Sequence, residues 1–197
     1  RDLPKKYNQW CSVVRWEKTT RPLLRGKEFL WQEGHTIHAT EQEAKEETME
    51  MLSVYEALGK ELLAIPFVTG RKTEKGKFAG AEATYSIEAL MPDGQALQSG
   101  TTHYFGQGFA QAFNISYRDQ ENLQQFVYQT SWGVSTRLLG AIIMVHGDDD
   151  GLVMPPRVAP TQIVIVPISQ DEEVLSTASQ LYEGLKTQFR VIMGQNS

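Results

Sequence analysis

The sequence predicts an α+β fold, in which an antiparallel β-sheet is flanked by helices and followed by the start of an α/β unit. Three observations support this prediction. Short runs of β-branched and aromatic residues alternate with tight turns, a long segment after Thr40 has helical periodicity, and an apolar run at 161–168 precedes an amphipathic segment. Because the chain opens at Arg1 without a methionine, we expect a fragment of a longer protein.

The first elements are predicted to form a hairpin. Residues 9–17 and 28–32 have the composition of strands, and the charged segment between them contains the turn residues Pro22 and Gly26. Two strands joined in this way form an antiparallel pair, and we expect the basic tip of the hairpin to be mobile.

A helix is predicted to begin after Thr40. Thr40 and Glu43 form a capping-box pattern, and the helix should end before Pro66. We expect the acidic residues to lie on a solvated face. The apolar residues recur with helical spacing and define one buried stripe, which consists of Ala44, Met51, Leu52, Tyr55, Leu58 and Leu62.

The next segment is predicted to complete the sheet. A basic loop spans 70–80, Pro92-Asp93-Gly94 is predicted to be a tight turn, and 133–145 is predicted to be a mostly buried helix. The predicted strands occupy 83–91, 94–103, 112–117 and 125–131.

A proline-rich connection at 154–160 predicts a domain boundary, with a first domain at 1–159 and the beginning of a second at 160–197. Residues 161–168 resemble a strand buried on both faces, and together with the helix after it they would make the first half of a βαβ unit. The apolar positions of that helix are Val174, Leu175, Ala178, Leu181, Tyr182, Leu185 and Phe189.

Composition limits the functional classes. The 197 residues suit one domain, or one domain with part of a second, and 41% hydrophobic residues are enough to form a core. The net charge of −5 argues against binding of nucleic acid or membranes through bulk charge, although a local basic groove is compatible with it. The single Cys11 excludes a disulfide framework. The apolar stretches are too short to span a bilayer and we find no signal peptide, so we expect a cytoplasmic protein without membrane contact.

Two arginines indicate an anion site. Arg15 and Glu17 share one face of the first predicted strand, where they form either a structural ion pair or part of a phosphate site. Gly133 to Arg137 places hydroxyls and an arginine at the start of a predicted helix, where phosphate is favoured, although Ser135 and Thr136 are also suitable caps. Together the two segments would neutralise polyphosphate from two sides.

Polar residues also alternate along two predicted strands. Gln98 and Thr102 are expected on one face of their strand, with Thr101 and His103 on the other, and such polarity inside a sheet suggests a ligand. On the earlier strand Trp31, Glu33 and His35 share one face, and an aromatic ring beside a carboxylate suits a small ammonium ligand.

Possible metal ligands form weaker patterns. His35 and His38 have a spacing that could hold a metal, but no cysteine or third nearby histidine supports them. The acidic run Asp148–Asp150 is better interpreted as a turn than as part of a calcium loop. We therefore predict no protein-built metal site.

Several segments in this order resemble a known family. Residues 13–17 (VVRWE) and 25–35 (RGKEFLWQEGH) resemble motif 2 of the class II aminoacyl-tRNA synthetases, in the form found in the prolyl-tRNA synthetase family. The motif 3 region is similar to 132–138 (WGVSTRL), 144–148 (MVHGD) and 152–159 (LVMPPRVA), and 70–80 and 98–103 also fit. The resemblance implies a class II catalytic core over 1–159 and the beginning of an anticodon-binding domain over 160–197.

The resemblance also implies a reaction and its residues. Proline and ATP would form prolyl-adenylate, and the prolyl group would pass to tRNA(Pro), with Mg²⁺ between the phosphates. Arg15 would bind the α-phosphate, Arg25 and Arg137 the bent triphosphate, Phe29 and Glu17 the adenine, and Gln98 and Thr101 would line the ATP site. The residues around proline would be Trp31, Glu33, Phe78, His103 and Ser135.

The interval between Arg15 and Arg137 is short and leaves little room for an editing insertion between motifs 2 and 3. In this respect the chain resembles the compact eukaryotic and archaeal-like branch of the family. In this family, motif 1 and a proline-contacting loop would lie upstream of Arg1. We therefore expect this chain alone to be nearly inactive and poorly dimeric, whereas the intact protein would be a homodimer.

Two other interpretations stay open. One is a synthetase-like paralogue that binds nucleotide or a protein partner without catalysis, against which the arginines, Glu17 and Phe29 argue. The other is a metal hydrolase built on His35, His38 and Asp148–Asp150.

Overall fold

The structure is a computed structural model that describes residues 2–194. The chain divides into two compact units, Arg1–Leu152 and Val153–Ser197. The α+β prediction is confirmed, because helices accompany an antiparallel sheet in the first unit.

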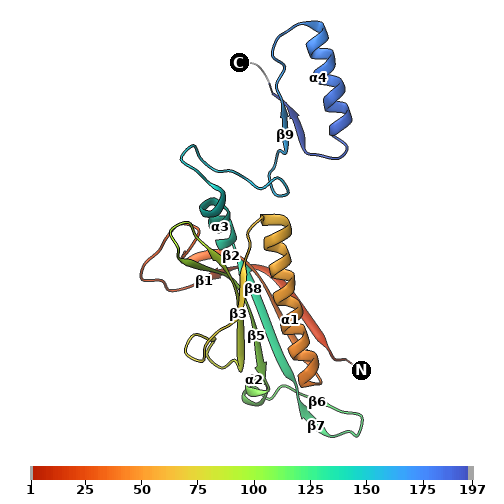
Figure 1. Ribbon diagram of the computed structural model, residues 1–197. Helices are drawn as coiled ribbons and strands as arrows, with labels where there is room; N and C mark the ends of the chain where they lie inside the picture. The colour runs from red at the N-terminus through yellow and green to blue at the C-terminus, as the bar shows by residue number, and fades with distance from the viewer. Residues whose placement is uncertain (1, 195–197) are drawn as a thin grey trace. The chain divides into compact units, whose positions relative to one another are not determined.

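The first unit is built on a six-stranded sheet with the order β1-β2-β8-β5-β4-β3 (Figure 1). Every neighbouring pair in it is antiparallel. The central strands come from distant parts of the sequence, since β2 pairs with β8. The strands are β1 (Lys5–Val14), β2 (Glu28–His38), β3 (Val68–Arg71), β4 (Ala83–Leu90), β5 (Ala96–Gly106) and β8 (Tyr128–Ser135).

The predicted N-terminal hairpin is confirmed, with different limits. β1 begins four residues earlier than expected and ends at Val14, and β2 continues to His38. Residues 15–17 therefore lie just beyond the strand that was expected to contain them, although the backbone N–H of Arg15 still donates to the carbonyl of Lys27 at 2.7 Å.

The capping box correctly predicts the start of the long helix. α1 (Glu41–Ala57) begins after Thr40, whose hydroxyl accepts a hydrogen bond from the backbone N–H of Glu43 at 3.2 Å. It continues as a π-helical segment, η1 (Leu58–Leu63), and ends before Pro66 as expected. The wider π turn changes the helical register, so that Leu63 is buried where Leu62 was predicted.

α1 lies along one face of the sheet (Figure 1), and the interface contains polar groups. Glu47 was expected on the solvated side but is buried, where it pairs with Lys6 of β1. Tyr55 donates to the side chain of Gln32 at 2.8 Å, and His38 lies 2.8 Å from Thr36 Oγ1. These partners offset part of the cost of burial, although Nδ1 of His38 has no hydrogen-bond partner among the described residues.

The prediction of a strand at 112–117 is largely wrong. A short helix, α2 (Gly108–Ala112), precedes a small hairpin of β6 (Ser116–Arg118) and β7 (Gln124–Phe126). Asn114 has a φ of 54°, which ends the helical turn. The strand at 83–91 and the turn at 92–94 are confirmed, whereas part of the predicted basic loop belongs to β3.

The helix predicted from residue 133 begins later. Residues 133–135 are the end of β8, and α3 (Arg137–His146) starts only after them. α3 is also less buried than expected, because Leu139 and Ile143 are exposed.

The second unit contains a complete βαβ motif. β9 (Ile163–Ile165), α4 (Glu172–Leu185) and β10 (Val191–Met193) follow one another, and β9 and β10 are parallel. The sequence analysis missed β10. It also expected a doubly buried strand at 161–168, but the strand covers only 163–165. Val164 within it is exposed, and so are Val166 and Ile168 beyond its end.

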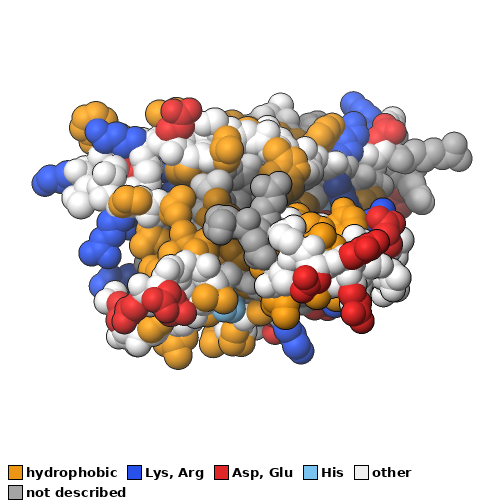
Figure 2. Space-filling model, turned by 90° about the horizontal axis from the view of Figure 1, so that it is seen from above, with side chains coloured by type: hydrophobic (Ala, Val, Ile, Leu, Met, Phe, Trp, Pro, Cys, Tyr) orange, Lys and Arg blue, Asp and Glu red, His pale blue; other side chains and the backbone are white. Residues whose placement is uncertain are grey.

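Acidic, basic and hydrophobic side chains are interspersed on the face shown in Figure 2. Among residues 2–194, each helix is too short or too polar to cross a membrane.

A tight contact between β2 and β8 gives a test of the packing. A β-carbon at Gly34 would overlap the indole of Trp132 on the paired strand. We expect Gly34→Ala to lower the free energy of unfolding by about 2 kcal/mol or more, because overpacking a strand pair forces both strands to shift. Urea unfolding of the intact protein measures this change.

Gly133→Ala is the matched control. A β-carbon there has its nearest neighbour at 3.5 Å, an ordinary contact, and we expect a change below about 1 kcal/mol. Equal effects of the two substitutions would contradict the packing argument.

Candidate active site

A cavity of about 880 Å³ lies in the first unit, on the sheet face away from α1. The twelve residues that the sequence analysis assigned to a site all line it. They are Arg15, Glu17, Arg25, Phe29, Trp31, Glu33, Phe78, Gln98, Thr101, His103, Ser135 and Arg137.

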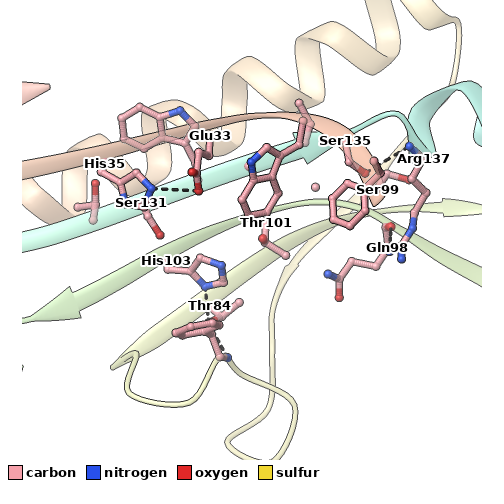
Figure 3. Close-up of a pocket in the computed structure, with 18 of the residues that line it drawn as sticks. Glu33, His35, Thr84, Gln98, Ser99, Thr101, His103, Ser131, Ser135 and Arg137 are labelled. Atoms are coloured by element: carbon pink, nitrogen blue, oxygen red, sulfur yellow. Dashed lines mark hydrogen bonds and ion pairs between the residues drawn. The ribbon is translucent and has the colours of Figure 1, made fainter. Parts of the chain in front are cut away.

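Strand pairing places the central residues in rows across the sheet (Figure 3). Glu33 of β2 is opposite Gly133 of β8, which in turn is opposite Thr101 of β5. In the next row Ser131 lies between His35 and His103. The glycine in the middle of the first row leaves space above the sheet between Glu33 and Thr101.

A β-bulge changes the predicted alternation on β5. Gly100 pairs with Ile87 and Gln98 pairs with Glu88, so that Ser99 is an extra residue. The sequence analysis expected Gln98 and Thr101 on opposite faces, but the bulge brings both to the cavity.

Arginines gather at one end of the cavity. Arg137 at the start of α3 donates from Nε to the carbonyl of Leu24 at 2.9 Å and from Nη1 to the carbonyl of Gln98 at 3.1 Å. No hydrogen bond within residues 2–194 engages its Nη2. Burial, followed by the positive charges of Arg25 and Arg15, lowers the pKa of Arg137. The guanidinium remains charged, and the cluster favours an anionic ligand.

The acidic partner at this end is Glu17. Its carboxylate lies 3.7 Å from Arg25 Nη1, so the ion pair that the spacing suggested between Arg15 and Glu17 is replaced by one across the loop. Arg15 lies over the rings of Phe29 and Trp31, 5.2 and 5.4 Å from their centroids. This cation–π contact holds the guanidinium against two other residues of the cavity lining.

The other end of the cavity contains the carboxylate of Glu33 and several aromatic residues. The Glu33 side chain is 17% exposed, lies 3.1 Å from His35 Nε2 and accepts a hydrogen bond from Gln9. Trp31, Glu33 and His35 share one face of β2, as the sequence analysis predicted. A carboxylate among aromatic rings suits a small ammonium group.

His103 and Phe78 complete this end. Their rings are 5.1 Å apart, and Nδ1 of His103 lies 2.9 Å from the hydroxyl of Thr84. Burial, with a smaller effect from the charge of Lys72, lowers the pKa of His103 to about 4. The imidazole is therefore neutral at pH 7.

Sequence reasoning missed the aromatic residues behind His103. Phe105 stacks on His103 at 5.8 Å, and Phe109 of α2 meets Phe105 edge-on at 5.2 Å. Phe109 also packs on the loop at Gly80, whose φ of +88° favours glycine and where a β-carbon would lie 2.6 Å from the Phe109 ring. Residues two apart on a strand share a face, so the position of His103 also indicated that Phe105 faces the cavity. No local sequence pattern indicated Phe109.

The suggested metal ligands are not brought together. His35 lines the cavity, whereas His38 is buried on the opposite face of β2. Asp148 accepts hydrogen bonds from the backbone of Asp150 and Gly151, which is the arrangement of an acidic turn. Within residues 2–194 no group of three or more His, Cys, Asp or Glu side chains is placed to hold a metal ion. This arrangement does not support a metal hydrolase.

Sequence comparisons relate the chain to a known group of enzymes. The family model described as tRNA synthetase class II core domain (G, H, P, S and T) matches residues 1–146. A protein named proline–tRNA ligase from Ruminiclostridium cellulolyticum is 67% identical over 194 residues, which are 98% of this chain and 41% of that protein. Another with this name, from Lachnoclostridium phytofermentans, is 69% identical over 192 residues, 97% of this chain and 40% of that protein.

A solved structure is also similar. The crystal structure of prolyl-tRNA synthetase from Cryptosporidium parvum, complexed with L-proline and AMP, matches with a TM-score of 0.94 and 43% identity, over 100% of this chain and 44% of that one. The chain thus spans about 40% of the length of the curated relatives it matches.

The protonation of His103 can be tested directly. We expect its ring to titrate with a pKa of about 4 in the folded protein, which NMR of the histidine ring protons measures. In the unfolded chain the pKa is near 6.5, so the unfolded state binds more protons between these values. The free energy of unfolding therefore does not depend on this histidine above about pH 6.5, where the ring is neutral in both states. It decreases as the pH falls from about 6.5 toward 4. A folded-state midpoint above pH 6 would contradict this account.

Proposed function

We propose, since the chain belongs to the family of class II tRNA synthetase core domains (G, H, P, S and T), that it is the catalytic part of a proline–tRNA ligase. The observation that carries the proposal is the division of one cavity into an arginine end and an aromatic end with a carboxylate. The names of the relatives and of the solved structure support the choice of proline among the amino acids of this family.

The reaction needs charge stabilisation more than acid–base chemistry. A carboxylate oxygen of proline would attack the α-phosphorus of ATP, forming the mixed anhydride prolyl-adenylate while pyrophosphate leaves. Because the carboxylate is already ionised at pH 7, no general base is required. In a second step the prolyl group would pass to a terminal hydroxyl of tRNA(Pro), and AMP would leave.

The arginine end would hold ATP. We assign Arg15 to the α-phosphate and Arg25 and Arg137 to the bent triphosphate, since these three charges converge on the cavity. Phe29 would stack on adenine and Glu17 would accept from its amino group. Gln98 and Thr101 would line the site on the β5 side.

The aromatic end would hold proline. Its secondary ammonium would pair with Glu33, while Trp31, Phe78 and His103 enclose the ring and Ser135 lies at the side of the cage. The carboxylate of proline would then point along the cavity toward Arg15. Such positioning of the two reactants accounts for a large part of the rate enhancement in reactions of this type.

Mg²⁺ would neutralise the phosphates. Since no group of three metal ligands occurs within residues 2–194, the ion would be held mainly by the phosphates and water, which is the usual mode for Mg²⁺ in nucleotide sites.

The intact protein would be a cytoplasmic homodimer that binds tRNA(Pro). Residues 160–197 would begin its anticodon-binding domain, and 1–159 would belong to the catalytic core. The βαβ motif of β9, α4 and β10 is compatible with the α/β architecture expected of that domain.

Proline-dependent ATP–pyrophosphate exchange by the full-length protein tests the function. We expect exchange with proline and little with alanine or cysteine, because the ring of proline would contact the aromatic residues that line this end of the cavity and the smaller side chains would not. Absence of exchange from a folded, dimeric protein would favour a non-catalytic paralogue that binds nucleotide.

Arg137→Ala tests the arginine end. We expect at least a hundredfold loss of adenylate formation, since a charge that stabilises the transition state is removed. Arg118→Ala, on β6 and outside the cavity, is the control and should leave the rate unchanged. An unaltered rate in Arg137→Ala would reduce this residue to a structural role.

Glu33→Gln tests the aromatic end. We expect the KM for proline to rise at least about tenfold, because a charge-assisted hydrogen bond is lost, while the KM for ATP changes little. Steady-state exchange with each substrate varied in turn measures both constants. An equal rise in both would contradict the assignment of Glu33 to proline.

A further inference from the structure

The buried hydroxyl of Thr84 joins two walls of the proposed proline cage (Figure 3). Thr84 lies in β4 and is 1% exposed. Its Oγ1 accepts a hydrogen bond from the backbone N–H of Phe78 at 3.1 Å and lies 2.9 Å from Nδ1 of His103. Phe78 belongs to the loop between β3 and β4, and His103 belongs to β5. One hydroxyl therefore connects the loop to the sheet.

Hydrogen-bond accounting assigns the proton between Thr84 and His103. A threonine hydroxyl has one proton and two lone pairs, and Phe78 N–H occupies one lone pair. If Nδ1 carried the ring proton, this N–H would donate to the second lone pair of Thr84. The buried hydroxyl proton of Thr84 would then have no acceptor, which costs free energy. If Thr84 donates to a bare Nδ1, every group is satisfied. The proton of the neutral ring is then on Nε2.

Packing alone does not determine this orientation. Phe105 stacks on His103 and Phe78 lies on it at a tilt of 51°, so the two rings limit where the imidazole can lie. A flip of the imidazole by 180° preserves its shape but exchanges nitrogen and carbon positions. The contact with Thr84 distinguishes the two orientations.

We propose that Thr84 is a positioning residue for the amino-acid substrate, which acts by holding His103 as a neutral donor with its Nε2–H toward the cavity and by fixing Phe78 beside it. The low pKa of His103 is consistent with a neutral donor. The ligand partner would be the carboxylate oxygen of proline that does not attack the phosphate, because the two carboxylate oxygens are the only hydrogen-bond acceptors of proline. The kinetic part of this inference rests on the proposed function, whereas the tautomer does not.

Thr84→Val removes the hydroxyl while it preserves the shape. We expect the KM for proline in pyrophosphate exchange by the full-length protein to rise about tenfold, because His103 and the loop lose their shared partner. The KM for ATP should stay within about twofold. Thr84→Ser restores the hydroxyl and should restore the KM for proline.

Thr102→Val is the matched control. Thr102 is also a buried strand threonine, but it lies on β5, and its hydroxyl has no hydrogen-bond partner among the described residues. We expect unchanged kinetic constants. An unchanged KM for proline in Thr84→Val, or a rise in both KM values, would overturn the proposal, since the second result would indicate a general packing defect.

The tautomer gives an independent readout. In protein with ¹⁵N-labelled histidine, we expect the ring nitrogens of His103 to show Nε2–H at pH 7 and a mixture in Thr84→Val. Nδ1–H in the wild type would overturn the proposal even if Thr84→Val does not fold. If the wild type lacks proline-dependent exchange but shows Nε2–H, the proposed function fails while the role of Thr84 in orienting His103 stands.

Discussion

The antiparallel pairing of β2 with β8 is the constraint on which the cavity depends. It places Trp31 opposite Ser135 and Glu33 opposite Gly133, so that residues from the two sequence motifs lie side by side. The close approach is possible because Gly34 has no side chain to meet Trp132. β5 then continues the same rows on the other side of β8. The arginine end and the aromatic end are separated along these strands, which would set the distance between the two reactants of the proposed reaction.

The two faces of the sheet meet different physical requirements. The face under α1 buries polar groups such as Thr36 and His38, which share a hydrogen bond. The cavity face leaves charges incompletely neutralised, because Arg137 is held by backbone carbonyls rather than by a carboxylate. Charges that are fixed in place but not cancelled are what a site for polyphosphate needs, since they do not have to reorganise when the ligand binds.

Local patterns predicted the features that depend on neighbours in the sequence. The capping box at Thr40 and the alternation of Trp31, Glu33 and His35 are of this kind, and the twelve residues assigned to the ATP and proline sites line one cavity. Features that depend on distant contacts were missed. The bulge at Ser99 arises from pairing with β4, and Glu47 is buried because Lys6 comes from another strand. The short strands of the second unit were ambiguous because their length carries little periodicity.

The pairing of β2 with β8 also has a consequence for biosynthesis. Thr36 and Thr130, which meet across these strands, are 94 positions apart in the chain. At the usual speed of ribosomes, about 5–20 residues per second, β2 waits for roughly 5–20 seconds before its partner is made. During that interval the hairpin of β1 and β2 has one unpaired edge, which makes the nascent chain dependent on protection from aggregation. A ligand in the cavity can therefore stabilise only those chains whose sheet has already closed.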